Sequence, residues 1–245
     1  MSEAARRRIV RVPLIVAAGS KFEKYKPEEE RDVRKVTVER DAALEQLIAA
    51  WKKYDYVSTP YHVEAYLNAL KRIKGLDYSS KDVENFCIAL AGFQDEKSFS
   101  DKAGHFLSAL INNGKDTEYV INTRHLTVEI HGLGHRNTKS ITVNGNAGAQ
   151  VGAYMEGGSI TVNGNAGEYV GLDMKRGSIT VNGNANQHVG YEMEGGCITV
   201  NGDADWGVGA YMGGGEIHIE GDCKGLSEQI EGGKIYHKGV LIVDK

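Results

Sequence analysis

Apolar and polar positions repeat every 19 residues through the C-terminal half of the chain. The isoleucine column consists of Ile141, Ile160, Ile179, Ile198 and Ile217. The methionine column consists of Met155, Met174, Met193 and Met212, and the glycine column of Gly152, Gly171, Gly190 and Gly209. A fixed period held over many columns is typical of a solenoid, in which each repeat packs against its two neighbours.

Each repeat contains one short strand and at least one sharp corner. The segment I-T-V-N-G alternates apolar and polar residues, which indicates a strand with one buried face. Gly and Asn after it supply a corner at low steric cost. Stacked repeats would place Ile over Ile and Met over Met, with parallel strands about 4.8 Å apart. The pattern therefore predicts a parallel β-helix of about six coils over residues 117–245.

The repeat decays at both ends of this region. Residues 117–140 are expected to form an irregular first coil, with strands at 118–122 and 125–130. The segment 131–134 (H-G-L-G) lies about one coil before Val151-Gly152. The apolar run 240–243 (V-L-I-V) predicts a final strand that covers the open end.

The N-terminal part shows helical periodicity instead. The four expected helices are 41–51, a helix capped by Thr59 or Ser58 that ends at Ile73, one capped by Ser80 that ends at Phe93, and 101–112 before Gly114. Residues 8–16 suggest a strand, and 21–40 are open between loop, strand and helix. The predicted fold is α+β, with a mainly helical domain and cap at 1–116 and the β-helix at 117–245. We expect the helices to cover the first open end of the solenoid.

Charge is unevenly distributed along the chain. The 245 residues carry a formal net charge of −4, but residues 141–233 contain 12 acidic and 3 basic side chains. The rest of the chain is therefore net basic. The acidic solenoid argues against nucleic acid as a partner. The basic segments 6–11 and 21–35 leave open a contact with an acidic partner or with the solenoid of another copy.

Cysteine usage and hydropathy bear on the compartment. Cys87, Cys197 and Cys223 are odd in number and have no C-x-x-C spacing, which predicts reduced thiols and a cytoplasmic location. No segment reaches the roughly 18 apolar residues of a membrane helix, so no membrane association is expected. The apolar stretch 12–18 is too short for a signal peptide.

The repeat unit resembles a known family. The unit V-G-A-Y-M-E-G-G-S-I-T-V-N-G-N-A-G (151–167) and its copies are similar to the glycine-rich β-helix family named for its G-x-G-x-G repeats. That family includes the C-terminal domain of glutamate synthase, one of the subunits of formylmethanofuran dehydrogenase and stand-alone archaeal relatives. The likeness spans about residues 117–239, and residues 106–114 also resemble the segment that leads into the repeats in stand-alone members.

The resemblance implies a right-handed parallel β-helix that packs against catalytic partners. In the two enzymes the chemistry is carried by other parts, on flavin, iron–sulfur, molybdenum or tungsten, or amidohydrolase centres. This chain has no cysteine cluster for an iron–sulfur centre and no glutamine-hydrolysing N-terminal cysteine, so no cofactor is expected. The resemblance alone does not make the chain an oxidoreductase.

Few side chains suggest a site. His125, His131 and His135 cluster in the irregular first coil, which leaves open a metal site or ordinary capping and solvated histidines. The methionines are interpreted as a core column and the glycines as corners, since no helix follows them to bind a phosphate. The recurring asparagines predict hydrogen-bonded ladders between coils. The outward Thr and Asn rows leave a templating surface as an alternative.

No nucleophile, base and acid can be placed together, so no catalytic residue is predicted. The sequence favours a non-catalytic scaffold that docks a partner protein or a second copy. One alternative is an accessory, non-catalytic subunit of a redox or glutamate synthase-like or formylmethanofuran dehydrogenase-like complex. Another is a metal or small-molecule binding protein that uses the region around His131.

Overall fold

The computed structural model describes residues 42–57 and 63–245, which contain four α-helices, one 3-10 helix and ten strands. The predictions for residues 8–16 and 21–40, and the predicted cap at Thr59 or Ser58, lie outside the described residues. The helices are α1 (Ala42–Lys52), α2 (Val63–Ile73), α3 (Ser80–Ala89), the 3-10 helix η2 (Leu90–Phe93) and α4 (Phe99–Asn113).

All four predicted helices are present, with one correction at a start. The third helix is capped by Ser79 and not by Ser80, because the Ser79 hydroxyl accepts from the Asp82 N–H while the Asp82 carboxylate accepts from the Ser79 N–H. This reciprocal pair is a capping box. The α-helix stops at Ala89, and the tighter 3-10 turn η2 continues the segment to Phe93.

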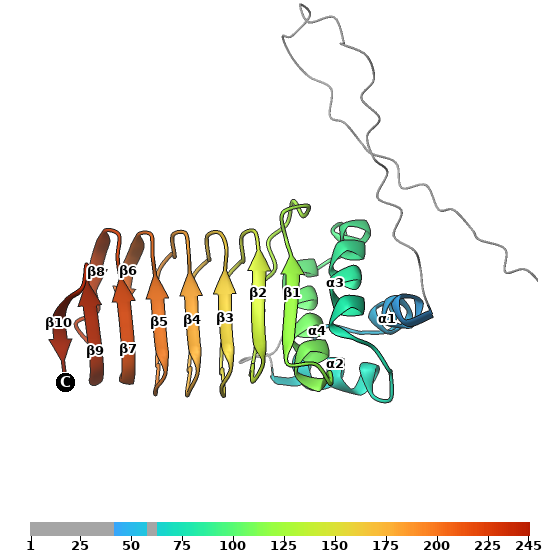
Figure 1. Ribbon diagram of the computed structural model, residues 1–245, viewed down its shortest axis with the longest axis horizontal. Helices are drawn as coiled ribbons and strands as arrows, with labels where there is room; N and C mark the ends of the chain where they lie inside the picture. Colours follow the sequence, from blue (N-terminus) through green and yellow to red (C-terminus); the bar gives the residue numbers. More distant parts are fainter. Residues whose placement is uncertain (1–41, 58–62) are drawn as a thin grey trace, which may run out of the picture. The chain divides into compact units, whose positions relative to one another are not determined.

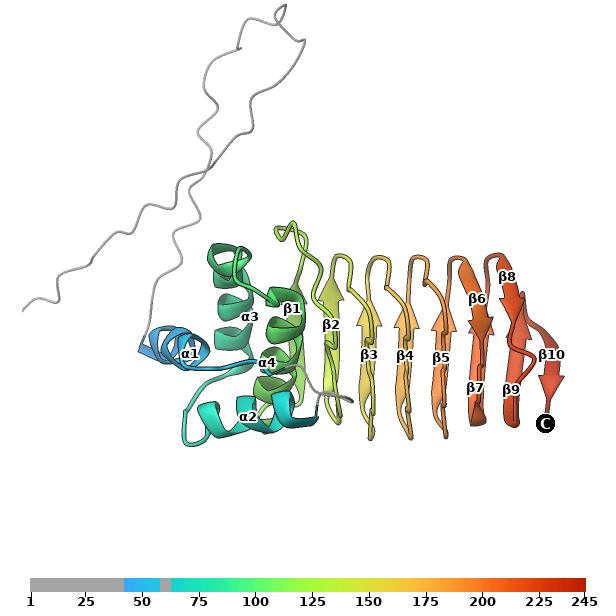
Figure 2. The same ribbon diagram turned by 180° about the vertical axis from the view of Figure 1, so that it is seen from behind.

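The strands build a parallel solenoid, as predicted, and only the last pair, β9 with β10, is antiparallel. They are β1 (Glu118–Asn122), β2 (Ser140–Asn144), β3 (Ser159–Val162), β4 (Ser178–Val181), β5 (Cys197–Val200), β6 (Ala204–Val208), β7 (Gly213–Ile219), β8 (Cys223–Leu226), β9 (Gly232–His237) and β10 (Val240–Asp244). Eight form one sheet in the order β1-β2-β3-β4-β5-β7-β9-β10, and β6 pairs with β8 on a second wall. Figure 1 shows the large sheet as a row of strands, and Figure 2 shows it from behind.

The register confirms the predicted columns. Ile141 pairs with Ile160, and the same step of one coil continues through Ile217 to Ile235. Every isoleucine and methionine of the two columns is at most 1% exposed. Like side chains are therefore stacked in the interior, where each large one contributes about 1.5–3 kcal/mol on burial.

Two further features allow neighbouring coils to pack closely: hydrogen bonds between asparagines and a column of glycines. The side-chain amide of Asn163 donates to Asn144 at 3.1 Å, and the same bond recurs from Asn182 and from Asn201. The predicted asparagine ladder is therefore confirmed. In the glycine column, Gly171 has φ +70°, and a Cβ there would lie 2.4 Å from Cδ1 of Ile198. Only glycine lets the backbone come this close to the isoleucine column.

The helices cover the β1 end of the solenoid and form one compact unit with it, residues 40–245. Both views show α3 and α4 beside β1 (Figures 1 and 2). The Cys87 thiol of α3 donates to the Asn122 carbonyl of β1 at 3.2 Å. On α4, a Cβ at Gly104 would lie within 2 Å of the His131 carbonyl oxygen, so helix and first coil touch through their backbones.

One strand prediction is wrong. Residues 125–130 form turns and bends and no strand. The reason is their neighbour: the Thr127 and Val128 N–H groups donate to Oε1 of Gln94, at 2.7 and 3.0 Å, just after η2. A helical segment offers no ladder of backbone partners, so the alternating pattern alone does not make a strand here.

Candidate functional site

The most distinctive side chains lie on one corner of the solenoid. We call residues 132–136, 150–154, 169–173, 188–192 and 207–211 the corner ridge. In each of these segments the first, third and fifth residues have positive φ. Glycine always holds the third place, but the first and fifth places are mostly not glycine. These non-glycine residues are Arg136, Gln150, Tyr154, Tyr169, Asp173, His188, Glu192 and Tyr211, with φ between 50° and 63°.

These residues are held in a backbone conformation that L-amino acids avoid. A left-handed conformation costs a non-glycine residue about 1–2 kcal/mol, and bulky residues rarely adopt it. Gly132 and Gly207 occupy the first place in two of the segments, so the corner accepts glycine. The first place therefore carries Gln150, Tyr169 and His188 where glycine would cost less, and the fifth place holds a non-glycine residue in every one of these coils. Such local strain is common where side chains contact a ligand or partner.

Part of the corner ridge is hollowed. A depression of about 270 Å³, which we call the corner hollow, separates Tyr154 from Tyr191. Its lining residues are His135, Gln150, Tyr154, Leu172, Asp173, Tyr191 and Glu192. It exists because Asp173 follows Tyr154 in the fifth-place column, where the smaller side chain leaves room between two coils. Backbone bonds from Tyr154 N–H to Leu172 O, at 2.7 Å, and from Asp173 N–H to Tyr191 O, at 3.0 Å, fix the wall.

The corner hollow is net negative, because its lining includes the carboxylates of Asp173 and Glu192 and no lysine or arginine. Burial, together with the nearby Glu192 and Glu194 carboxylates, raises the pKa of Asp173 above its usual value. Lys175 lowers it by a smaller amount, and its ammonium lies 3.9 Å from Glu194. Among the residues that the structure describes, neither Asp173 nor Glu192 forms a salt bridge. A cation placed in the hollow would relieve this repulsion.

Aromatic rings border the same carboxylates. Tyr154 meets the His135 ring edge-on at a centroid distance of 5.2 Å, and Tyr191 meets Tyr211 edge-on at 5.5 Å. These contacts hold both tyrosine rings in place before any other molecule binds. Ring faces beside carboxylates attract an ammonium or guanidinium group through both the ring quadrupole and the negative charge. The corner hollow is therefore suited to a lysine or arginine side chain.

The three histidines singled out from the sequence have separate neighbours. Nε2 of His125 lies 3.2 Å from the Cys87 carbonyl, and Nδ1 of His131 lies 3.3 Å from the Asp101 carboxylate. The bond to Asp101 raises the pKa of His131. His135 is buried and is one of the residues that line the corner hollow. Across residues 42–57 and 63–245 no three His, Cys, Asp or Glu side chains are grouped to hold a metal ion.

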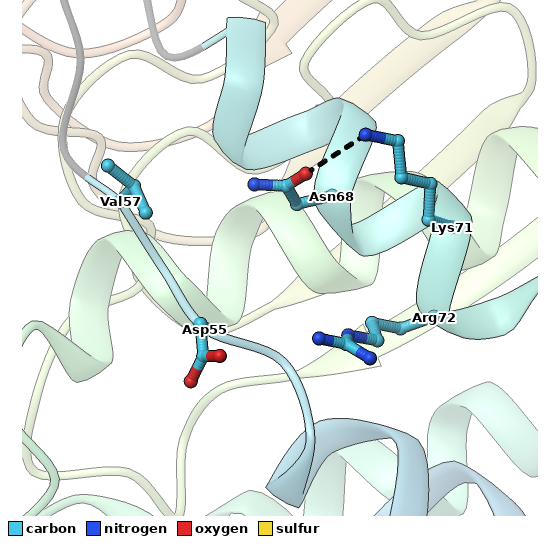
Figure 3. Close-up of a pocket in the computed structure, with 5 residues that line it drawn as sticks. All are labelled: Asp55, Val57, Asn68, Lys71 and Arg72. Carbon is cyan, nitrogen blue, oxygen red and sulfur yellow. Dashed lines mark hydrogen bonds between the residues drawn. The ribbon is translucent and has the colours of Figure 1, made fainter.

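A second hollow, of about 320 Å³, lies on the helices. Figure 3 shows its lining residues Asp55, Val57, Asn68, Lys71 and Arg72, with Lys71 donating to Asn68 at 3.4 Å. Residues 58–62, which follow Val57 directly, are outside the described part of the chain. The lining of the corner hollow, by contrast, lies well within the described residues, so the corner hollow is the better candidate.

From the sequence, Asp173 and Glu192 are interpreted as exposed loop acids beside the methionine column; the structure shows Asp173 partly buried and places both in the lining of the corner hollow. Tyr154, Asp173, Glu192 and Tyr211 occupy the same column, directly before the constant methionines. What distinguishes these positions in the sequence is that the residue changes from one repeat to the next, while the methionine directly after it stays the same. This signal marks a surface whose chemistry is not set by the fold.

Comparison with models of protein families and with curated proteins finds no match for this chain. The resemblance to the glycine-rich β-helix family therefore stays a prediction. Among the helices that the structure describes, none has the length and apolar character to cross a bilayer.

Proposed function

We propose that the protein is a non-catalytic docking scaffold, and that the corner hollow receives a basic side chain of a partner protein. The observation that carries this proposal is the set of tyrosine and acidic residues kept in left-handed backbone conformations around the hollow. Three of them, Tyr154, Asp173 and Glu192, occupy the fifth place, where a left-handed backbone costs about 1–2 kcal/mol and no coil has glycine. Recognition of a partner gives a reason for them.

Rigidity supports a docking role. Backbone and asparagine bonds tie each coil to the next, and Asp173 and Tyr191 are fixed by their neighbours before any partner arrives. A surface that is ordered beforehand loses little conformational entropy on binding. A basic group in the hollow would gain cation–π and charge interactions at low cost.

The cysteines support a role without covalent catalysis. Burial raises the pKa of the Cys87 thiol to about 12, and burial also raises the pKa of Cys197 and of Cys223. Thiols with raised pKa values are poor nucleophiles at neutral pH. All three are unpaired, and the cytoplasmic location predicted from them is part of this proposal.

The test compares co-purification from native cells by the native chain and by the double variant Asp173→Asn/Glu192→Gln. The control is Glu220→Gln/Glu228→Gln, which removes the same charge from exposed positions outside the hollow. We expect the native chain and the control to recover the same identified proteins. The corner variant should recover at least about tenfold less of them, as expected for loss of buried charge pairing at an interface.

Equal recovery by all three proteins, or no recovery by the native chain, would overturn the proposal. The identity of the recovered proteins also separates two forms of it. A flavin, molybdenum, tungsten or iron–sulfur partner favours the accessory-subunit alternative. A partner without such a centre favours a general assembly role.

A further inference from the structure

The two ends of the solenoid differ in how they are covered. The β1 end lies against α3 and α4. At the other end β10 pairs with β9 alone and is the last strand in the sheet order, so within the described residues its second edge has no strand partner. Figures 1 and 2 both show β10 at the outer limit of the row of strands.

The side chains of β10 are apolar and exposed. Val240 is 62% exposed, Leu241 43% and Ile242 44%. No charged residue lies between positions 240 and 243. Natural proteins usually protect a sheet edge with lysine, proline or a covering segment, and an unprotected apolar edge favours strand addition.

The occupant that fits this edge is a second copy of the same chain. A strand from the β1 end of another molecule is not available, because α3 and α4 lie against that end. Association of one β10 with another is isologous, so it closes after two copies and does not continue into a fibre. Antiparallel pairing about a two-fold axis at Leu241 places Val240 of one copy opposite Ile242 of the other, so that apolar side chains meet apolar side chains. Lys238 lies in the turn between β9 and β10 and is paired with Asp222 of its own chain at 2.7 Å, so it takes no part in this contact.

We propose that two copies of this chain associate through antiparallel pairing of their β10 strands, which joins their large sheets into one. The pairing covers the apolar residues 240–242 in both copies. It leaves the corner ridge outside the strand pairing, so this proposal does not depend on the docking role proposed above.

Sedimentation equilibrium of the full chain tests this, with variants matched in chemistry. Ile242→Lys and Leu241→Lys put a charge into the proposed interface, and Val120→Lys puts the same charge on an exposed apolar position of β1. The native chain and Val120→Lys should show twice the chain mass of 26.7 kDa. For the β10 variants, the dissociation constant of the dimer should be at least tenfold higher than for the native chain. At concentrations where both proteins are monomeric, the variants and the native chain should have the same melting temperature.

Three outcomes would overturn the proposal. The first is a native chain that stays monomeric at 100 µM, a concentration on the order of those at which weak interfaces form. The second is a dimer that survives both β10 substitutions. The third is a mass that grows beyond two copies. If instead Val120→Lys alone abolishes the dimer, the interface lies at the β1 end and the assignment to β10 is wrong.

Discussion

The interior columns and the corner ridge belong to the same 19-residue unit, yet they obey opposite constraints. Inside, Met155 and its three copies repeat without change and are fully buried. One position earlier, the column Tyr154, Asp173, Glu192 and Tyr211 changes in every coil and is partly or fully exposed. Constancy inside follows from close packing, because each side chain is the neighbour of its own copies. Variation at the corner indicates that the fold itself does not fix which residue stands there.

The largest effect should come from charge inside a column. Met174→Glu places a carboxylate in the fully buried methionine column, beside Met155 and Met193. We expect the free energy of unfolding to fall by about 3–5 kcal/mol, as for an uncompensated buried charge. Urea denaturation measures this. Met174→Leu, which nearly conserves volume, should cost less than about 1.5 kcal/mol. Equal midpoints for the native chain and Met174→Glu would contradict the interior placement.

A smaller loss is expected at the glycine column. Gly171→Ala puts a Cβ 2.4 Å from Ile198 Cδ1 and forces a left-handed conformation on alanine. We expect destabilisation of about 1–3 kcal/mol, measured by thermal unfolding. The matched control is Gly157→Ala in the preceding coil, where a Cβ meets no atom within 4 Å and φ is not left-handed. If both alanines cost the same, close approach is not what selects glycine here.

The smallest effect should come from the corner ridge and should have the opposite sign. Asp173 has a raised pKa in the folded chain, so its charge opposes folding at neutral pH. Asp173→Asn should raise the free energy of unfolding at pH 7 by less than about 1 kcal/mol, because solvent screens this partly buried group. The docking test should nevertheless be sensitive to the same position.

The pH profile gives the sign of the Asp173 contribution. An acid with a raised folded pKa binds its proton more tightly when folded, so the native chain gains stability as the pH falls from the folded pKa to the ordinary value of 3.8. Denaturation midpoints of native chain and Asp173→Asn should therefore converge as the pH is lowered over that interval. Parallel profiles would show that Asp173 does not oppose folding.

The sequence predicted the repeated part well because its contacts are periodic. Residues 19 apart become neighbours in every coil, so the burial of Ile179 or Met193 follows from the pattern. The prediction failed at residues 125–130, where the neighbour is η2 and Gln94 takes the backbone N–H groups. Nothing local at Thr127 signals a partner 33 residues earlier.

The candidate site was only partly accessible from the sequence. His135 was singled out as a possible metal ligand, and the structure places it in the lining of the corner hollow, in ring contact with Tyr154. The hollow depends on which side of the coil each varying residue faces, and on Asp173 lying one coil after Tyr154. The repeat predicts that these residues are aligned from coil to coil. It does not predict the space left between side chains of different size.

The period of the coil, its buried columns and its asparagine ladder can all be deduced from the amino-acid sequence, because like residues stack on like. The contacts at the two ends of the solenoid and the shape of the corner hollow become visible only in the folded chain. At the β1 end α4 meets the first coil backbone to backbone at Gly104, while β10 leaves apolar residues exposed at the other. The physical reason is that a repeat specifies contacts between its own copies, whereas contacts of non-repeating residues depend on which segments meet in space.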